Sequence, residues 1–358
     1  MKLVAAVKLV PTPAQAECLM ATLARCNEAC DWLAALAWDT ATFGQYALHK
    51  IGYVEVRKRF GLTAQAAVRC ISKVADAYKL DRETQRHFRT DAAQPYDDRI
   101  IRFVKDGAAV SIWTVEGRIT IPVVMGEHQK ALMAFRKGEV DLCLVRGKWM
   151  LAATCDIPET DEFKAEDWLG VDLGIVSLAV DSDGTVYTGA DVERKRRRAQ
   201  KRRDGLQKRG TKAAKRRLRK LAGKQARYQK HINHCIAKAV VLDAERTSRG
   251  IAIEKLKGIR QRVTARSNQR ARLGNWGFAQ LGGFIGYKAR RAGVPVVYVD
   301  PRYTSRQCAE CGCIDKKNRT NQATFSCVSC KHADNADHNA ARNIRAKVIV
   351  TKPCVLAA

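Results

Sequence analysis

The sequence contains no apolar run that approaches the length of a membrane-spanning helix. The opening residues Met1-Lys2-Leu3-Val4 also lack the long apolar core of a signal peptide. These two absences argue against a membrane protein and against a secreted one. We therefore expect a cytoplasmic protein with no membrane partner.

Acidic residues are scarce. The chain has 36 Asp and Glu against 65 Lys and Arg, which gives a formal net charge of +29. Residues 1–160 hold 22 basic and 18 acidic residues, whereas residues 161–358 hold 43 and 18. The second half is therefore expected to bind a polyanion. Nucleic acid is the first candidate, and the protein is then expected to be nucleoid-associated. An anionic membrane is the competing partner, but the basic residues lack flanking aromatic or lipidation signals.

Cysteines in a disulfide pattern are also lacking. Of the thirteen, seven lie among apolar or helical residues, as reduced core cysteines do. Cys308, Cys311, Cys327 and Cys330 instead form two CxxC pairs with fifteen residues between them. This spacing predicts one tetrahedral structural Zn²⁺, because each pair presents two thiolates to one ion. Two redox pairs are the alternative, and Cys313 and His332 are left out of the predicted ligand set.

The stretch Trp168–Val176 predicts a buried strand that ends on a carboxylate, Asp172, and turns at Gly174. Residues 176–180 alternate like the second strand of a hairpin. A lone Asp at such a place is most often a turn former. A catalytic role for Asp172 therefore depends on its partners.

Two further acids occupy comparable positions. Glu254 ends the short apolar strand 250–254, and Asp337 opens a predicted helix at 337–344, where it could simply be a capping residue. Three such carboxylates can converge beside a sheet and hold two Mg²⁺ for phosphodiester hydrolysis. Asn339 and Arg342 on the same helix either assist or serve as capping and surface residues.

These segments resemble the TnpB family, the transposon-encoded RNA-guided nucleases related to type V CRISPR effectors. The resemblance rests on Gly170–Gly174, on Ile253–Leu256 and on Asp337–Ile344, in that order, together with residues 293–305 and the cysteines after them. It is much weaker before about residue 165. The family carries an Asp, Glu, Asp triad in a RuvC-like domain of RNase H fold, which implies catalytic and Mg²⁺-binding roles for Asp172, Glu254 and Asp337.

The pattern of the first half predicts short strands before and after a group of helices. Residues 2–10 predict a strand and 96–153 several more with tight turns, which suggests a small barrel. Helices are expected from Pro13 to about Trp38 and from Thr63 to about Lys79, with a break over 44–52 and the chain resuming at Val54. The resemblance implies that the barrel is a wedge-like domain and the helices a recognition domain, together holding guide RNA and the DNA duplex.

The most basic segment, 194–230, has 19 Lys and Arg and predicts an antiparallel helical hairpin along a nucleic-acid duplex. The stretch 258–272 is expected to be mobile, and a helix is expected from Trp276 to Arg290. Candidate phosphate contacts are Arg194, Arg197, Lys201, Arg202, Lys208, Lys215, Arg216 and Arg219 on the hairpin, and Lys316, Lys317 and Arg319 on the cysteine-rich loop.

The expected architecture is a multidomain α/β chain with a RuvC-like RNase H fold, an inserted zinc ribbon and a preceding barrel with an inserted helical domain. Its expected parts are a barrel (1–12 and 96–158), a helical domain (13–95), a linker (159–166), a nuclease domain (167–303 and 332–358, with the hairpin 191–245 inserted) and a target-binding ribbon (304–331).

The predicted function is an RNA-guided DNA endonuclease of a transposable element, with a guide RNA for sequence selection and a short DNA motif read by the protein. Its cofactors would be two Mg²⁺, one Zn²⁺ and the guide RNA, and its partners guide RNA and target DNA, with the protein as a monomer or homodimer on the RNA. The alternatives are a guide-dependent DNA-binding repressor that does not cut and an unguided RuvC-like structure-specific nuclease.

Overall fold

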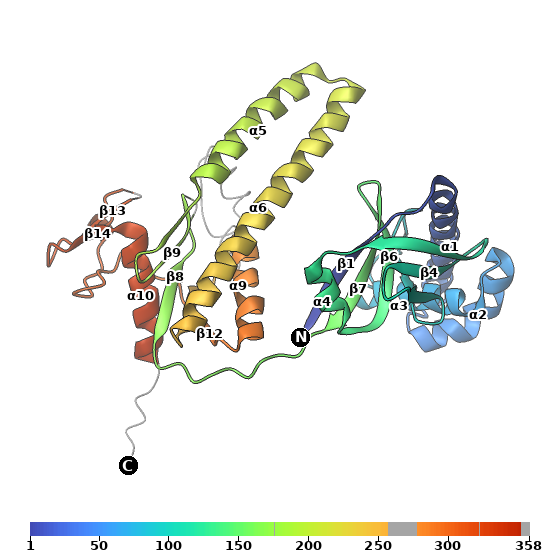
Figure 1. Ribbon diagram of the computed structural model, residues 1–358, viewed down its shortest axis with the longest axis horizontal. Helices are drawn as coiled ribbons and strands as arrows, with labels where there is room; N and C mark the ends of the chain where they lie inside the picture. The colour runs from blue at the N-terminus through green and yellow to red at the C-terminus, as the bar shows by residue number, and fades with distance from the viewer. Residues whose placement is uncertain (175, 257–277, 322, 352–358) are drawn as a thin grey trace, which may run out of the picture. The chain divides into compact units, whose positions relative to one another are not determined.

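The computed structural model describes residues 1–174, 176–256, 278–321 and 323–351. The chain divides into two units, Met1–Pro158 and Glu159–Ala358, and each is described by itself (Figure 1). Within the described residues, no helix combines the length and the apolar character needed to cross a membrane.

The first unit contains a seven-stranded sheet with the order β2-β6-β7-β1-β5-β4-β3. The strands β2 and β3 are consecutive in the chain yet lie at opposite ends of this order, so the sheet curls until it is nearly closed. The Tyr96 hydroxyl, on β2, donates to the carbonyl of Trp113 on β4 at 3.2 Å, which joins one end strand to the neighbour of the other, β3. The strands are β1 (Lys2–Leu9), β2 (Gln94–Tyr96), β3 (Ile101–Val104), β4 (Ala109–Thr114), β5 (Gly117–Val124), β6 (Arg136–Val145) and β7 (Lys148–Asp156).

Three helices lie between β1 and β2, namely α1 (Pro13–Asp39), α2 (Gln45–Phe60) and α3 (Ala64–Leu80), and a short helix α4 (Glu127–Met133) follows β5. The helix α1 begins at a capping box between Thr12 and Gln15, with Pro13 in its first turn. The expected helices from Pro13 and from Thr63 are confirmed. Their shared core includes Leu33, Val56 and Ile71.

The expected break over residues 44–52 was wrong, because α2 begins at Gln45 and runs through Gly52. A Cβ at this buried position would lie 2.8 Å from Leu33 Cδ2 of α1. Glycine is therefore present because the two helices approach closely, and the same residue type that ends helices elsewhere allows packing here.

The second unit is built on a five-stranded sheet with the order β10-β9-β8-β11-β12. The neighbours β10/β9 and β9/β8 are antiparallel, whereas β8/β11 and β11/β12 are parallel. The expected hairpin after Asp172 is therefore confirmed as β8 and β9. The strands are β8 (Trp168–Asp172), β9 (Ser177–Asp181), β10 (Val186–Thr188), β11 (Gly250–Glu254) and β12 (Val296–Val299).

Helices cover both faces of this sheet. The helices α6 (Lys212–Arg246) and α9 (Phe278–Ala292) share a core with β8 and β11 that includes Leu169, Val240 and Ile285. The opposite core holds Trp168 and Ala252 against Ile344 and Val348 of α10 (Ala336–Thr351). Gly170 of β8 faces α10 so closely that a Cβ there would clash with the backbone of Ala341.

The basic segment forms the expected helical hairpin, with α5 (Ala190–Arg209) packed along α6 (Figure 1). The turn lies at Gly210, whose φ of +63° suits a glycine, and Thr211 caps α6. The predicted helix from Trp276 is found as α9, although Trp276 itself lies outside the described residues. The basic stretch 258–272 also lies outside them.

Between β12 and α10 lies a small ribbon. It consists of the 3₁₀ turn η1 (Lys316–Asn318) and the two-stranded sheet of β13 (Thr324–Ser326) and β14 (Ala333–Asn335). Its core contains Cys308, Phe325 and Cys327, together with Ala336 of α10.

Candidate active site

The three predicted carboxylates lie at one edge of the second sheet. Asp172 and Glu254 end the neighbouring parallel strands β8 and β11, in which Val171 pairs with Ile253. Asp337 is in the first turn of α10, and a Cβ on Gly174, in the turn after β8, would lie 3.9 Å from its Oδ2. The structure therefore brings together all three acids that the sequence separates by 82 and 83 positions.

The charges of these acids interact. Burial, followed by the negative charges of Glu254 and Asp337, raises the pKa of Asp172 to about 8. Burial also raises the pKa of Glu254 and the pKa of Asp337 above their ordinary values. Like charges held together out of water favour protons or cations. The site therefore has the electrostatics of a cation-binding site.

Two neighbours hold two of the acids in place. The Thr304 hydroxyl, almost fully buried, donates to Glu254 Oε1. The Arg319 guanidinium donates to Asp337 Oδ1 at 3.0 Å and opposes the rise in the pKa of that carboxyl. Sequence reasoning gave Thr304 no role and assigned Arg319 to phosphate contact only. The signal that could have found Arg319 is its position in the cysteine-rich segment that precedes the helix of Asp337.

Asn339 and Arg342 have structural contacts. Asn339 is fully buried, donates to the Gln307 carbonyl at 2.8 Å and accepts from the Ala309 amide at 3.0 Å. Arg342 forms an ion pair with Glu310 at 2.6 Å. Asn343, one turn along, donates to the carbonyls of Thr304 and Gln307. These bonds fasten the ribbon to the helix that carries Asp337.

The predicted zinc cysteines converge. The Sγ atoms of Cys308, Cys311, Cys327 and Cys330 all lie within 4.8 Å of one another. The Cys308–Cys330 and Cys311–Cys327 Sγ distances are 3.7 and 3.5 Å. A tetrahedral ion with Zn–S bonds of about 2.3 Å needs Sγ separations of about 3.8 Å. Four thiolates with this spacing could bind zinc.

Cys313 and His332 stay outside that group. Among the described residues, the four cysteines are the one set of three or more His, Cys, Asp or Glu side chains whose ligand atoms lie this close together. The three carboxylates are therefore more widely spaced than the thiols.

The predicted hairpin contacts are all exposed, as phosphate contacts must be. Arg194 and Arg197 form exposed ion pairs with Asp191 and Glu193 on their own helix, and such pairs contribute little stability. Lys316 and Lys317 are exposed on η1, whereas Arg319 is half-buried against Asp337. The remaining exposed candidates on the hairpin are Lys201, Arg202, Lys208, Lys215, Arg216 and Arg219.

A groove between the two arms of the hairpin contains basic residues that the sequence prediction missed. It has a volume of about 710 Å³ and an apolar floor that includes Leu206 and Leu221. Arg202 is the only one of the predicted hairpin contacts that lines it. The other basic residues that line the groove are Arg209, Arg217, Lys220 and Lys224. A turn predicted at Gly210 would have indicated which residues of the two arms face each other.

Comparisons with known proteins match the second half of the chain to two family models. The family described as "Probable transposase" matches residues 154–264, and "Cas12f1-like, TNB domain" matches residues 278–344. The first range contains Asp172 and Glu254, and the second contains Asp337 and the four cysteines. A TnpB-like protein of Methanocaldococcus jannaschii, MJ0751, is 29% identical over 64% of this chain and 86% of its own length.

The resemblance to the TnpB family is confirmed.

Other relatives are matched over shorter shares of their length. Cas12f1 of Sulfoacidibacillus thermotolerans is 34% identical over 56% of this chain and 50% of its own length. The putative RNA-guided DNA endonuclease InsQ of Escherichia coli is 30% identical over 56% and 54%. The chain thus spans about half the length of several curated relatives. A chain in a solved Cas12f1–sgRNA–target DNA complex aligns over 96% of this chain and 99% of its own length, at 17% identity and a TM-score of 0.43.

Proposed function

We propose that the chain is an RNA-guided DNA endonuclease that cuts target DNA with Asp172, Glu254 and Asp337. The observation that carries the proposal is the convergence of these three acids at the ends of β8 and β11 and the start of α10, with a pKa of about 8 for Asp172. Relatives of the chain are named as RNA-guided or CRISPR-associated DNA endonucleases.

The second unit is proposed to be a RuvC-like RNase H fold. Three antiparallel strands followed by two parallel ones, with helices on both faces, support that assignment. In this proposal the nuclease domain comprises 167–303 and 332–358, with the basic hairpin inserted, and the ribbon 304–331 binds target nucleic acid. The nearly closed sheet and the helices α1–α3 would serve as wedge and recognition domains.

The acids fit two divalent cations of the Mg²⁺ type, because they are hard oxygen donors whose mutual repulsion a cation relieves. Bound there, two Mg²⁺ would activate water and stabilise the leaving oxygen of a phosphodiester. Thr304 would hold the Glu254 carboxylate in one orientation. Arg319, which contacts Asp337, would balance the charge of the acids and would bind the scissile phosphate once that contact opens.

The basic hairpin would hold the nucleic acid against this site. Its exposed cations line both arms, and the groove between them adds four more. Contacts of this kind neutralise phosphates without reading bases. Sequence selection would therefore come from base pairing between a guide RNA and the target, as it does in RNA-guided effectors.

The test is to purify the full chain with RNA from its own locus and sequence the RNA that accompanies it. Mg²⁺-dependent cutting of a plasmid library that matches this guide is then measured for the wild type, Asp172→Asn and the control Glu245→Gln, an exposed acid of the same unit. Guided cutting lost in Asp172→Asn and kept in the control is expected. Bound RNA with target binding but no cutting would favour a repressor, and cutting without RNA an unguided nuclease.

A further inference from the structure

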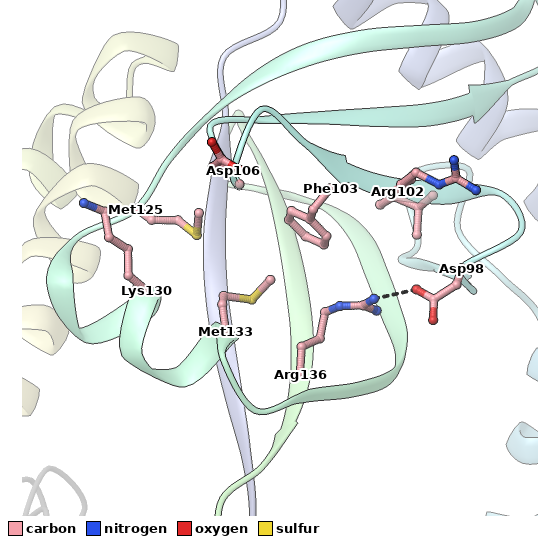
Figure 2. A pocket seen from close by; sticks show the side chains of 10 residues that line it. Asp98, Arg102, Phe103, Asp106, Met125, Lys130, Met133 and Arg136 are labelled. Carbon is pink, nitrogen blue, oxygen red and sulfur yellow. Dashed lines mark hydrogen bonds and ion pairs between the residues drawn. The ribbon is translucent and has the colours of Figure 1, made fainter.

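The first unit contains a pocket that the proposed nuclease chemistry does not use. Its volume is about 520 Å³, within the range of small-molecule and nucleotide sites. Figure 2 shows Phe103 of β3, Met125, Met133 of α4 and Arg136 of β6 directed toward one space. The other lining residues are Asp98, Ile101, Arg102, Asp106, Gly107 and Lys130.

The inner wall of the pocket suits a flat aromatic ligand. Phe103 is only partly buried, so part of its ring faces the pocket. Met125 and Met133 are likewise partly buried, and thioethers adapt to aromatic surfaces. A planar ring could therefore lie against Phe103 with the methionines around it.

One cation is fixed inside the pocket. The Arg136 guanidinium forms an ion pair with Asp98 at 2.6 Å and lies 5.6 Å from the centre of the Phe103 ring. These two contacts hold its planar group beside the aromatic wall, where it can donate hydrogen bonds or stack. Because Asp98 compensates its charge, Arg136 would orient a ligand through hydrogen bonds or stacking more than attract it by charge.

Two further cations lie at the margin. Arg102 is exposed, and Lys130 is 58% exposed with Glu127 as an ion-pair partner at 2.9 Å. Their long side chains can turn toward an anion outside the apolar wall at little cost, because exposed ion pairs contribute little stability. The pocket thus combines an aromatic wall with marginal cations, the combination that recognises a base and its phosphate.

We propose that this pocket binds one unpaired nucleotide of the guide RNA, with its base against Phe103 and its phosphate near Arg102 or Lys130. The proposal rests on the proposed function, which supplies an RNA strand with unpaired positions. A base within a duplex is stacked on both sides and cannot enter, whereas a base in a loop or bulge can turn outward onto an aromatic side chain. A free nucleoside monophosphate has the same chemistry and is the other source.

The experiment is ultraviolet cross-linking of the full chain with its copurified RNA, followed by digestion and peptide mass spectrometry. A nucleotide adduct is expected on the peptide that contains Phe103. Phe103→Leu, which keeps an apolar core residue, should abolish the adduct and weaken RNA binding about tenfold, the loss of one stacked base. The control Phe135→Leu changes an exposed phenylalanine outside the pocket and should do neither.

A second variant changes an exposed side chain, so a loss of binding could not be attributed to a failure to fold. Lys130→Ala should lower the slope of log affinity against log salt by about one, whereas Lys137→Ala, at an exposed lysine of the same unit, should leave it unchanged. Parallel arms use RNA-free protein with a mixed single-stranded oligoribonucleotide, a matching oligodeoxyribonucleotide, or AMP and GMP.

Each outcome decides the proposal. Adducts from RNA support it, whereas adducts from AMP and GMP alone assign the pocket to free nucleotides, and adducts from DNA alone overturn the assignment to RNA. No adduct and full affinity in Phe103→Leu, with guided cutting intact, would overturn the pocket while the endonuclease proposal stands. If no guide RNA copurifies, the added oligoribonucleotide still tests the pocket.

Discussion

At the scale of single residues, the acids show how burial changes chemistry. Asp172 has an ordinary carboxyl group, yet its position at a strand end beside two other acids raises its pKa to about 8. Thr304 and Arg319 constrain Glu254 and Asp337 from outside the triad. A change to any one of these side chains is therefore felt by the others, and effects of double substitutions should not be additive.

The raised pKa predicts a pH-dependent response to Mg²⁺. The folded protein keeps a proton on Asp172 up to about pH 8, whereas the unfolded chain releases it near pH 4. The free energy of unfolding of the metal-free protein should therefore fall as the pH rises between these values. In the proposed site Mg²⁺ would bind the ionised acids, so its stabilising effect should grow over the same range.

Thermal melts with and without MgCl₂ at about pH 6 and about pH 9 measure this effect. The increase in Tm caused by Mg²⁺ should be larger at the higher pH in the wild type and should depend much less on pH in Asp172→Asn. An equal increase at both pH values in the wild type would contradict the prediction.

At the scale of elements, the position of α10 decides where Asp337 lies. The helix packs on the sheet at Gly170 and is joined to the ribbon through Asn339 and Asn343. The contact with the sheet and the bonds to the ribbon therefore determine the position of α10 along its axis and its rotation about that axis. The third acid depends on both of them, although neither contact includes it.

Gly170→Ala should displace this helix. The new Cβ would clash with the carbonyl oxygen of Ala341 and lie 2.7 Å from the Arg345 amide nitrogen, and backbone atoms cannot turn aside. We expect a loss of about 3 kcal/mol in the free energy of unfolding, measured by urea denaturation, and a loss of DNA cleavage.

Gly283→Ala is the matched control, because nothing lies within 4 Å of its added Cβ in α9. Alanine should stabilise that helix by up to about 1 kcal/mol. Equal stability of the two alanine variants would show that α10 does not pack on β8 as described.

Removal of zinc should act on the same helix from its other side. Chelation, or Cys327→Ser, should release the ribbon, because four thiolates without an ion have only the small core around Phe325 to hold them. The wild type should contain one zinc per chain, and amide exchange over 304–331 should accelerate on chelation. Serine at Cys313, outside the ligand group, should change neither; one zinc per chain retained in Cys327→Ser would contradict the predicted ligand set.

At the scale of the whole molecule, charge is divided between the units. The net charge is +5 for residues 1–158 and +24 for residues 159–358. Much of the surplus lies on α5 and α6, which contain all 19 Lys and Arg of residues 194–230. The second unit should therefore account for most of the salt dependence of nucleic-acid binding.

Neutralising the groove of the hairpin tests this division. Changing Arg202, Arg209, Arg217 and Lys220 together to Gln should weaken RNA and DNA binding and reduce the slope of log affinity against log salt by up to about four, one per phosphate contact. Filter binding over a salt series measures the slope. The control changes the exposed lysines 2, 8, 137 and 148 of the first unit to Gln. An equal loss of slope in both variants would show that binding follows net charge alone.

The sequence by itself determined the local features: helices and strands, the acids at strand ends, the paired cysteines and the surplus of charge. These follow from periodicity, turn residues and ligand spacing, which act over a few residues. Only the tertiary structure decided that Gly52 and Gly170 permit close packing, that Thr304 and Arg319 contact Glu254 and Asp337, and that Phe103 and Arg136 share a pocket. These contacts join segments distant in the chain, where only the packing of whole elements determines which side chains meet.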